Sequence, residues 1–166
     1  GKVGSSNGFD LEKFWYHCIA CGTAAQCISR LTASGDKEEC FIAGLIHDIG
    51  KLLLCQYLPD EFDKAINLSA QKEILFYDAE RELFDITHQE IGGFLAQRWN
   101  LPKSLQNAIL YHHQPSTSRD HYLITSVVHC ADILVRALDM GNGGDGKIPS
   151  MSENVWKTLS LDTENL

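Results

Sequence analysis

Apolar residues along this chain recur at helical spacing, and residues that commonly cap helices precede several of these stretches. Asp10 precedes a stretch that we expect to form a helix to about Ser34. Asp36 and Thr87 are each followed by Glu at the spacing of a capping box. Because no segment shows the alternation typical of strands, the sequence predicts an all-α fold.

The remaining helices are expected in segments bounded by proline, glycine or capping residues. We place them at about residues 36–54, 60–84, 88–99, 102–113, 120–140 and 153–159. The length of 166 residues and the hydrophobic content of 44% suit one domain with a single core. We therefore expect one helical domain over 10–166, preceded by a Gly/Ser-rich leader or expression remnant at 1–9.

With 22 acidic and 14 basic residues, the formal net charge is −8, and no Lys/Arg cluster stands out. We expect no nucleic-acid partner, because binding to phosphates needs a basic stripe. No apolar run approaches the ~20 residues that span a bilayer, and the chain starts without the pattern of a signal peptide. We therefore expect a cytoplasmic protein that does not associate with a membrane.

Six cysteines stand mostly inside apolar stretches, such as Cys40 before Phe41 and Ile42. We interpret them as reduced, small core residues. Cys18 and Cys21 have the C-x-x-C spacing found in many zinc and redox sites. This pair lacks a second pair, a following His and a preceding strand, so the zinc or redox alternative has little support.

Histidine and aspartate side chains interrupt several apolar helical stretches. His47 and Asp48 follow the apolar run 43–46, and Asp132 lies in an equally apolar segment. A buried His or Asp is costly unless it is paired or bound to an ion, and a mixed set suits Fe, Mn, Zn or Ni. Adjacent residues can bind one ion only at a helix end or an irregular turn, which Gly50 permits.

Lys51 lies one turn beyond Asp48 and is expected to face the same pocket, where it could hold a phosphate oxygen. Two other histidines have plainer interpretations. His121 stands beside charged residues and is expected at the surface. His129 is expected to be an ordinary core residue, with support of a metal ligand as the alternative.

The order His17, His47-Asp48, Asp132 resembles the HD superfamily of metal-dependent phosphohydrolases, and more closely the HDOD domain of bacterial signalling proteins. The resemblance spans roughly 10–165 and implies an HD-domain-like helical bundle. It rests on FWYH at 14–17, AGLIHDIGKLLL at 43–54, HQEIGGFLAQRWNLP at 88–102, AILYHHQP at 108–115 and VVHCADILVRALDMGNGGDGKIP at 127–149. Because HDOD proteins usually carry a further helical portion before this half, the chain is expected to be a fragment or an unusually short member.

The resemblance also implies a metal site. Ligand positions of the related HD-GYP phosphodiesterases correspond to His17, His47, Asp48, His88, His112, His113 and Asp132, and their pocket lysine corresponds to Lys51. One or two divalent transition-metal ions are therefore expected. The first would use His17, His47, Asp48 and Asp132, and the second His88 with at least one of His112 and His113, with Asp48 bridging.

Two departures from the HD-GYP pattern concern the reaction. Lys13 stands where the three-metal enzymes have Glu one turn before the first His. The segment QPSTS at 114–118 replaces the expected Gly-Tyr-Pro. Both departures argue against hydrolysis of cyclic di-GMP.

Two functions follow from these patterns. A signalling module would transmit a signal through contacts with signalling proteins or with another domain of the parent chain, and any metal would be structural or vestigial. A phosphohydrolase would use Asp48 and Lys51 as catalytic residues, with bridged metals activating water for attack on a phosphate-containing small molecule. The intact ligand set favours the enzyme. The family resemblance and the missing segment favour the module, which is our preferred hypothesis.

Overall fold

The computed structural model describes residues 9–33 and 35–161, and these residues contain helices but no β-strand. The predicted all-α fold class is therefore confirmed. The proposed leader at 1–9 lies outside the described residues except for Phe9, which packs against the ring of Phe14. The helices are α1 (Leu11–Thr32), α2 (Lys37–Ile46), α3 (Ile49–Tyr57), α4 (Pro59–Lys72), α5 (Phe76–Leu83), α6 (His88–Arg98), α7 (Lys103–Tyr111), η1 (Pro115–Thr117), α8 (Tyr122–Ala137) and α9 (Glu153–Thr158).

Local capping signals explain where several helices begin. The Asp10 carboxylate accepts hydrogen bonds from backbone N–H groups in the first turn of α1. The capping box of Thr87 and Glu90 is complete at the start of α6. At α2 only half of the expected box forms, because the carboxylate of Glu39 accepts a hydrogen bond from Ser104 on α7 instead.

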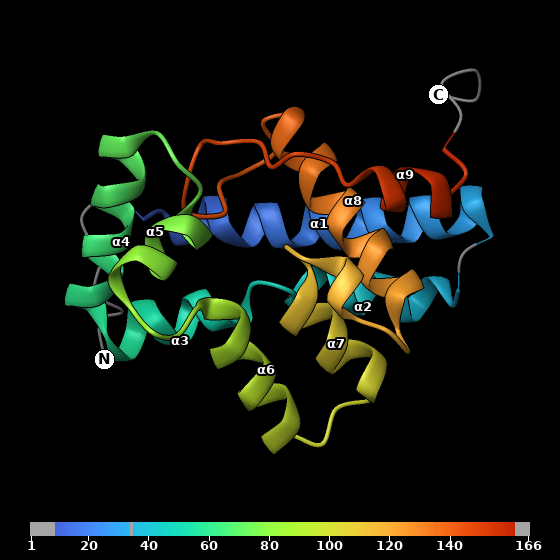
Figure 1. Ribbon diagram of the computed structural model, residues 1–166, viewed down its shortest axis with the longest axis horizontal. Helices are drawn as coiled ribbons and strands as arrows, with labels where there is room; N and C mark the ends of the chain where they lie inside the picture. Colours follow the sequence, from blue (N-terminus) through green and yellow to red (C-terminus); the bar gives the residue numbers. More distant parts are fainter. Residues whose placement is uncertain (1–8, 34, 162–166) are drawn as a thin grey trace.

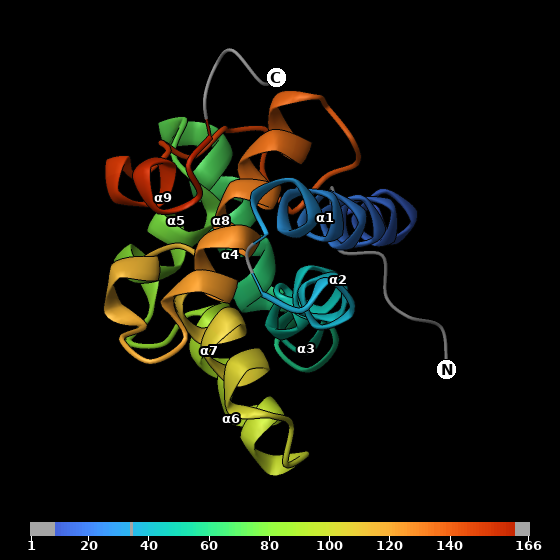
Figure 2. The ribbon, with the colours of Figure 1, turned by 90° about the vertical axis from the view of Figure 1, so that its right-hand side faces the viewer.

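The long helix α1 runs along the length of the molecule and packs against α2 and α8 (Figure 1). Viewed from the side in Figure 2, α2 and α3 lie beneath α1, and α6 and α7 form the lower part of the molecule. One apolar cluster joins α1, α2, α7, α8 and α9. A second joins the beginning of α1 to α3, α4 and α5. The polar residues singled out in the sequence come from the helices that bound these two clusters.

The segment Lys37–Tyr57, which contains α2 and α3, is long and apolar enough to cross a membrane by length and composition. Half of its most apolar window is buried inside the protein. The segment is also broken by a turn at 47–48. Core helices of water-soluble proteins have the same composition, so this segment is explained by the packing of the fold.

Two glycines allow helices to approach closely around the turn at 47–48. A Cβ at Gly44 of α2 would lie 2.7 Å from the carbonyl oxygen of Cys21 on α1. A Cβ at Gly50 of α3 would lie 1.9 Å from the carbonyl oxygen of His88 on α6. Glycine at these two positions therefore allows α1 and α6 to pack closely against the two sides of the turn.

Replacing Gly50 with Ala is expected to destabilise the fold. Backbone atoms of α6 cannot move aside as a flexible side chain can, so the methyl group should force α3 and α6 apart. Overpacking of this kind costs about 1–3 kcal/mol and occasionally more. Urea or thermal unfolding of Gly50→Ala measures the effect. Gly146→Ala is the control, since its Cβ would meet no atom within 4 Å. Equal stability of the two variants would contradict the close approach of α3 and α6.

Candidate metal centre

Asp48 lies at the centre of the clustered polar residues, at the turn between α2 and α3. The turn between His47 and Asp48 was expected, since neighbours on a regular helix point in different directions. The Oδ2 atom of Asp48 lies 3.8 Å from Nε2 of His17 and 3.4 Å from Nε2 of His47. Its Oδ1 atom lies 3.3 Å from Nε2 of His88 and 3.5 Å from Nε2 of His112. Each oxygen of this one carboxylate thus faces a different pair of imidazoles.

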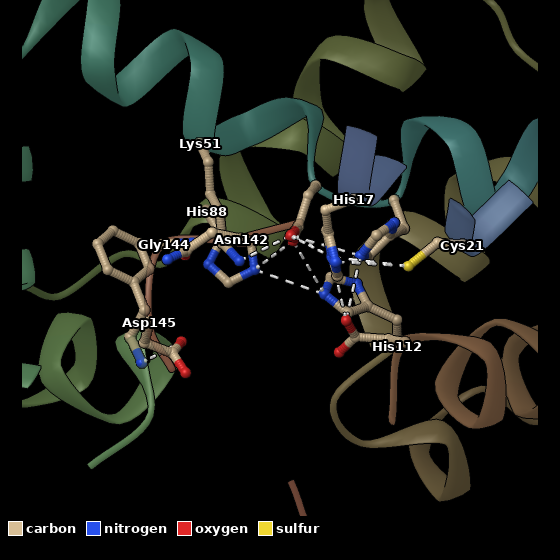
Figure 3. A network of polar contacts seen from close by, with 12 residues as sticks. His17, Cys21, Lys51, His88, His112, Asn142, Gly144 and Asp145 are labelled. Carbon is tan, nitrogen blue, oxygen red and sulfur yellow. Dashed lines mark hydrogen bonds and ion pairs between the residues drawn. The ribbon is translucent and has the colours of Figure 1, made fainter. Parts of the chain in front are cut away.

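The group facing Oδ2 is completed by Asp132 from α8. Oδ1 of Asp132 lies 3.2 Å from Nε2 of His17 and 3.8 Å from Nε2 of His47. The sulfur of Cys21, one turn after His17 on α1, lies 3.6 Å from Nε2 of His17 (Figure 3). This first group therefore joins α1, the 47–48 turn and α8.

The group facing Oδ1 contains His88 at the start of α6 and His112 and His113 just after α7. Nε2 of His88 lies 3.5 Å from Nε2 of His112. Ligand atoms of His88, His112 and His113 all lie within 4.8 Å of one another. All seven histidine and aspartate positions predicted from the sequence are thus brought together, and His113 is the least buried of them.

Hydrogen bonds at Nδ1, the ring nitrogen that points away from the centre, orient the imidazoles of His47 and His112. Nδ1 of His47 lies 2.7 Å from the carbonyl oxygen of Gly44, and Nδ1 of His112 lies 2.9 Å from that of Ile109. A carbonyl oxygen can only accept, so Nδ1 carries the proton in both rings. In the neutral rings Nε2 is then the unprotonated nitrogen, and it faces the centre.

His88 is oriented by a carboxylate. The carboxylate of Glu80 accepts from Nδ1 of His88 at 2.6 Å and from its backbone N–H at 2.9 Å. A carboxylate behind an imidazole ligand is a common arrangement at metal sites, because it fixes the ring and makes it more basic. Glu80 was not identified in the sequence, where no local pattern links it to His88.

Several buried atoms in the centre have no hydrogen-bond partner among residues 9–33 and 35–161. They include Nε2 of His47, Oδ1 of Asp48 and Nε2 of His113. Buried polar atoms in folded proteins are nearly always satisfied, so such a group of exceptions requires an explanation. Imidazole nitrogens and carboxylate oxygens that converge without partners match the donors that divalent transition metals bind. The residues present therefore fit a metal centre.

Both carboxylates of the centre are held in their ionised form. Burial raises the pKa of Asp48, but His47, Lys51 and His112 together lower it by more, and the result lies well below the usual value. The Nζ atom of Lys51 is 2.7 Å from Oδ2 of Asp48. Burial likewise raises the pKa of Asp132, but Arg136, His17 and His47 together lower it by more, and that pKa also lies well below its usual value. Ionised carboxylates are the form that a metal ion requires.

The imidazoles differ in their protonation. Burial lowers the pKa of His112 to about 4 and that of His113 well below its usual value. Burial also lowers the pKa of His88, but the carboxylates of Glu80 and Asp48 together raise it by more, so the pKa lies above its usual value. His112 and His113 are therefore neutral at neutral pH, ready to act as ligands, whereas a metal ion at His88 competes with a proton.

Arg136 holds Asp132 of the first group in position. Its Nε donates to Oδ1 of Asp132 at 2.8 Å, and its guanidinium also donates to Oδ1 of Asp145 at 2.9 Å. Asp145 belongs to the segment 141–147, in which a Cβ at Gly143 would lie 3.2 Å from Nε2 of His17. This segment therefore covers the first group. Arg136 is not among the residues predicted from the sequence, although its position one turn after Asp132 was a usable signal.

The remaining histidines have separate positions. Nδ1 of His129 lies 2.7 Å from the carbonyl oxygen of His112, so His129 supports the backbone of a candidate ligand. This agrees with the alternative interpretation of His129 as a residue that supports a metal ligand. His121 is the residue just before α8, is partly exposed and belongs to none of the candidate ligand groups found among the described residues.

A comparison with known families identifies similarity over most of the chain. A family model described as "HDOD domain" matches residues 2–115. The match includes His17 and His113 and all candidate ligands between them, and it ends before α8, which carries Asp132. An "Uncharacterized protein" of Treponema pallidum (strain Nichols) is 29% identical over 143 residues, which cover 84% of this chain and 28% of that protein.

Solved structures show the same fold. The crystal structure of an HDOD domain protein with unknown function from Geobacter sulfurreducens has a TM-score of 0.82 and 26% identity, over 93% of this chain and 54% of that chain. A "Putative signal transduction protein" from Marinobacter aquaeolei VT8 has a TM-score of 0.80 and 23% identity, over 97% of this chain and 35% of that chain. These likenesses confirm the predicted type of helical bundle. This chain spans less than two thirds of the length of each of these relatives.

Proposed function

Because this chain belongs to the HDOD domain family, we propose that it is a signal-transduction module that acts through protein contacts. A His/Asp metal centre would hold its helices in one arrangement. The proposed partners are signalling proteins or other domains of a longer parent chain. The greater length of the relatives is consistent with a parent chain that contains further domains.

The observation that carries this proposal is the closure of the centre. The residues His17, Asp48 and Lys51 are each 0% exposed. A substrate phosphate would have to reach Lys51 and the space between the ligands, and the burial of these residues opposes its entry in this conformation. A closed centre suits a structural role, because structural sites are surrounded by protein ligands whereas catalytic sites keep a position open.

The ligands come from segments that lie far apart in the sequence. The first ion would be held by His17, His47, Asp48 and Asp132, and the second by His88, His112 and His113 with the other oxygen of Asp48. The metal expected from these nitrogen and oxygen donors is Fe, Mn, Zn or Ni. The first ion would hold α1 and α8 to the turn at 47–48, and the second would hold α6 and the residues just after α7 to the same turn.

Exposed apolar side chains support a role in protein contacts. Leu31 on α1 and Leu138 just after α8 are 74% and 68% exposed. They lie with Tyr16, Ile19 and Trp156 around a cavity of about 450 Å³ between α1, α8 and α9. Apolar surface gathered around a hollow is typical of regions that bind another protein segment.

A metal-dependent phosphohydrolase is the second candidate, and the position of Lys51 favours it. Its ammonium group lies 2.7 Å from the carboxylate oxygen of Asp48, where it could hold a phosphate oxygen beside the metals. Bound metal ions would supply a Lewis acid and lower the pKa of a water molecule. Such activity requires that the segments covering the centre open to admit a substrate.

Turnover by metal-loaded protein separates the two functions. The chain, purified without an affinity tag, is reconstituted separately with Fe²⁺, Mn²⁺, Zn²⁺ and Ni²⁺, and its metal content is measured by elemental analysis. We expect bound metal but no hydrolysis of bis(p-nitrophenyl) phosphate or cyclic di-GMP above that of Asp48→Asn. Hydrolysis that depends on Asp48 would show that the chain is a phosphohydrolase and would contradict the signalling-module proposal. Protein that holds no metal after reconstitution would exclude both the structural centre and this enzyme.

A further inference from the structure

Cys21 faces the first group of candidate ligands from the same side of α1 as His17. Residues four apart on a helix lie one above the other on one face. The Cys21 sulfur lies 3.6 Å from Nε2 and 3.9 Å from Nδ1 of His17. Figure 3 shows the sulfur directed toward the cluster of imidazoles. The thiol is fully buried, and the seven candidate ligands considered so far do not include it.

The separations in this group match those of ligands around one metal ion. Zinc binds imidazole nitrogen at about 2.1 Å and thiolate sulfur at about 2.3 Å, so tetrahedral geometry separates the two donors by about 3.6 Å. The Cys21 sulfur and Nε2 of His17 have this separation. Ligand atoms of His17, Cys21, His47 and Asp132 all lie within 4.8 Å of one another.

The neighbouring Cys18 does not share this position. Cys18 is buried in the apolar cluster that also contains Phe9 and Phe14. Cys21 belongs to a small cluster with Ala20 and Val135, next to the metal centre. The C-x-x-C spacing therefore does not create a paired thiol site, and of its two cysteines only Cys21 belongs to a candidate ligand group of the described residues.

We propose that Cys21 is a further ligand of the first metal ion, alongside His17, His47, Asp48 and Asp132. The proposal rests on the metal centre described under the proposed function. On binding, the thiol transfers its proton to solvent and a sulfur–metal bond forms. A thiolate is a soft donor, so the first site should prefer Zn²⁺ to the harder Mn²⁺, which oxygen ligands favour.

Cobalt(II) substitution tests the sulfur ligand directly. The full chain is stripped with chelator and titrated with Co²⁺ while its absorption spectrum is recorded. We expect visible ligand-field bands from the bound ion and a near-ultraviolet thiolate-to-cobalt charge-transfer band. The charge-transfer band should disappear in Cys21→Ser and in Cys21→Ala, while the visible bands remain. Cys18→Ala is the matched control, because it removes another buried cysteine of α1 that belongs to none of the candidate ligand groups found among the described residues, and it should keep the charge-transfer band.

The outcomes distinguish this proposal from the metal centre on which it rests. Visible bands without a charge-transfer band in the unaltered chain would overturn the role of Cys21 and leave the centre intact. Absence of all bound Co²⁺ would overturn both. Circular dichroism of the stripped proteins verifies that each variant folds, and Cys21→Ala avoids the buried hydroxyl that Cys21→Ser introduces.

Competition between metals gives an independent measurement. Cys21→Ser keeps a small donor at the position but replaces sulfur with a hard oxygen. We expect the ratio of Zn²⁺ to Mn²⁺ affinity to fall at least about tenfold, since even changing a residue that hydrogen-bonds to a metal ligand alters metal affinity by about 10–100-fold. An unchanged ratio in Cys21→Ser, with both ions bound, would overturn the proposal.

Discussion

Asp48→Asn is expected to remove nearly all bound metal. The loss of metal affinity should be at least about 100-fold, more than is typical when a residue that hydrogen-bonds to a metal ligand is changed. The reason is the position of a single carboxylate. One oxygen faces His17 and His47, and the other faces His88 and His112. An amide keeps the shape of the side chain but loses the negative charge, so both halves of the centre lose their shared anionic ligand. Elemental analysis after dialysis, with isothermal titration of the stripped protein, measures the change.

The folding of this variant needs its own control, because Lys51 is buried against Asp48. Removing one partner of a buried ion pair is destabilising by about 3–5 kcal/mol, since the other charge stays unpaired. The double variant Asp48→Asn, Lys51→Met removes that charge and should regain stability without regaining metal. Asp85→Asn changes an exposed aspartate outside the candidate ligand groups. Metal content near that of the unaltered chain in the folded Asp48 variants would show that Asp48 is not a bridging ligand.

Stripping the metal is expected to lower the melting temperature by roughly 8–16 °C. A ligand that binds only the folded state stabilises it by about 4 kcal/mol at a thousandfold excess over its Kd. For a domain of this size, each kcal/mol corresponds to about 2–4 °C. Thermal unfolding followed by circular dichroism, with chelator and again after metal is added back, measures the shift.

A ligand variant separates this effect from a general action of the chelator. Asp132→Asn should melt below the unaltered chain in the presence of metal, and chelator should change its melting temperature much less. An unaltered chain whose melting temperature stays the same after verified metal removal would rule out a structural role for the ion. Catalysis, or an incidental site, would then have to account for the ligands.

The helices and the types of ligand could be inferred from the sequence because they depend on local patterns. Helical spacing of apolar residues predicts α1 and α8, and capping residues such as Asp10 and Thr87 mark where helices begin. The adjacent His47 and Asp48 in an apolar segment identified polar groups that could not remain buried without partners. Their assignment as metal ligands remains a prediction.

Only the tertiary structure decided how these residues are arranged and what supports them. The division of the Asp48 oxygens between two groups depends on α1, α6 and α7 meeting at one turn, which no local pattern specifies. Glu80 reaches His88 from another helix, and Asp145 reaches Arg136 from a loop. Cys21 looks in the sequence like any small core residue, because a thiol's position relative to His47 and Asp132 depends on the packing of three helices. Contacts between segments distant in sequence are set by the packing of whole helix faces, so they become visible only when the chain is folded.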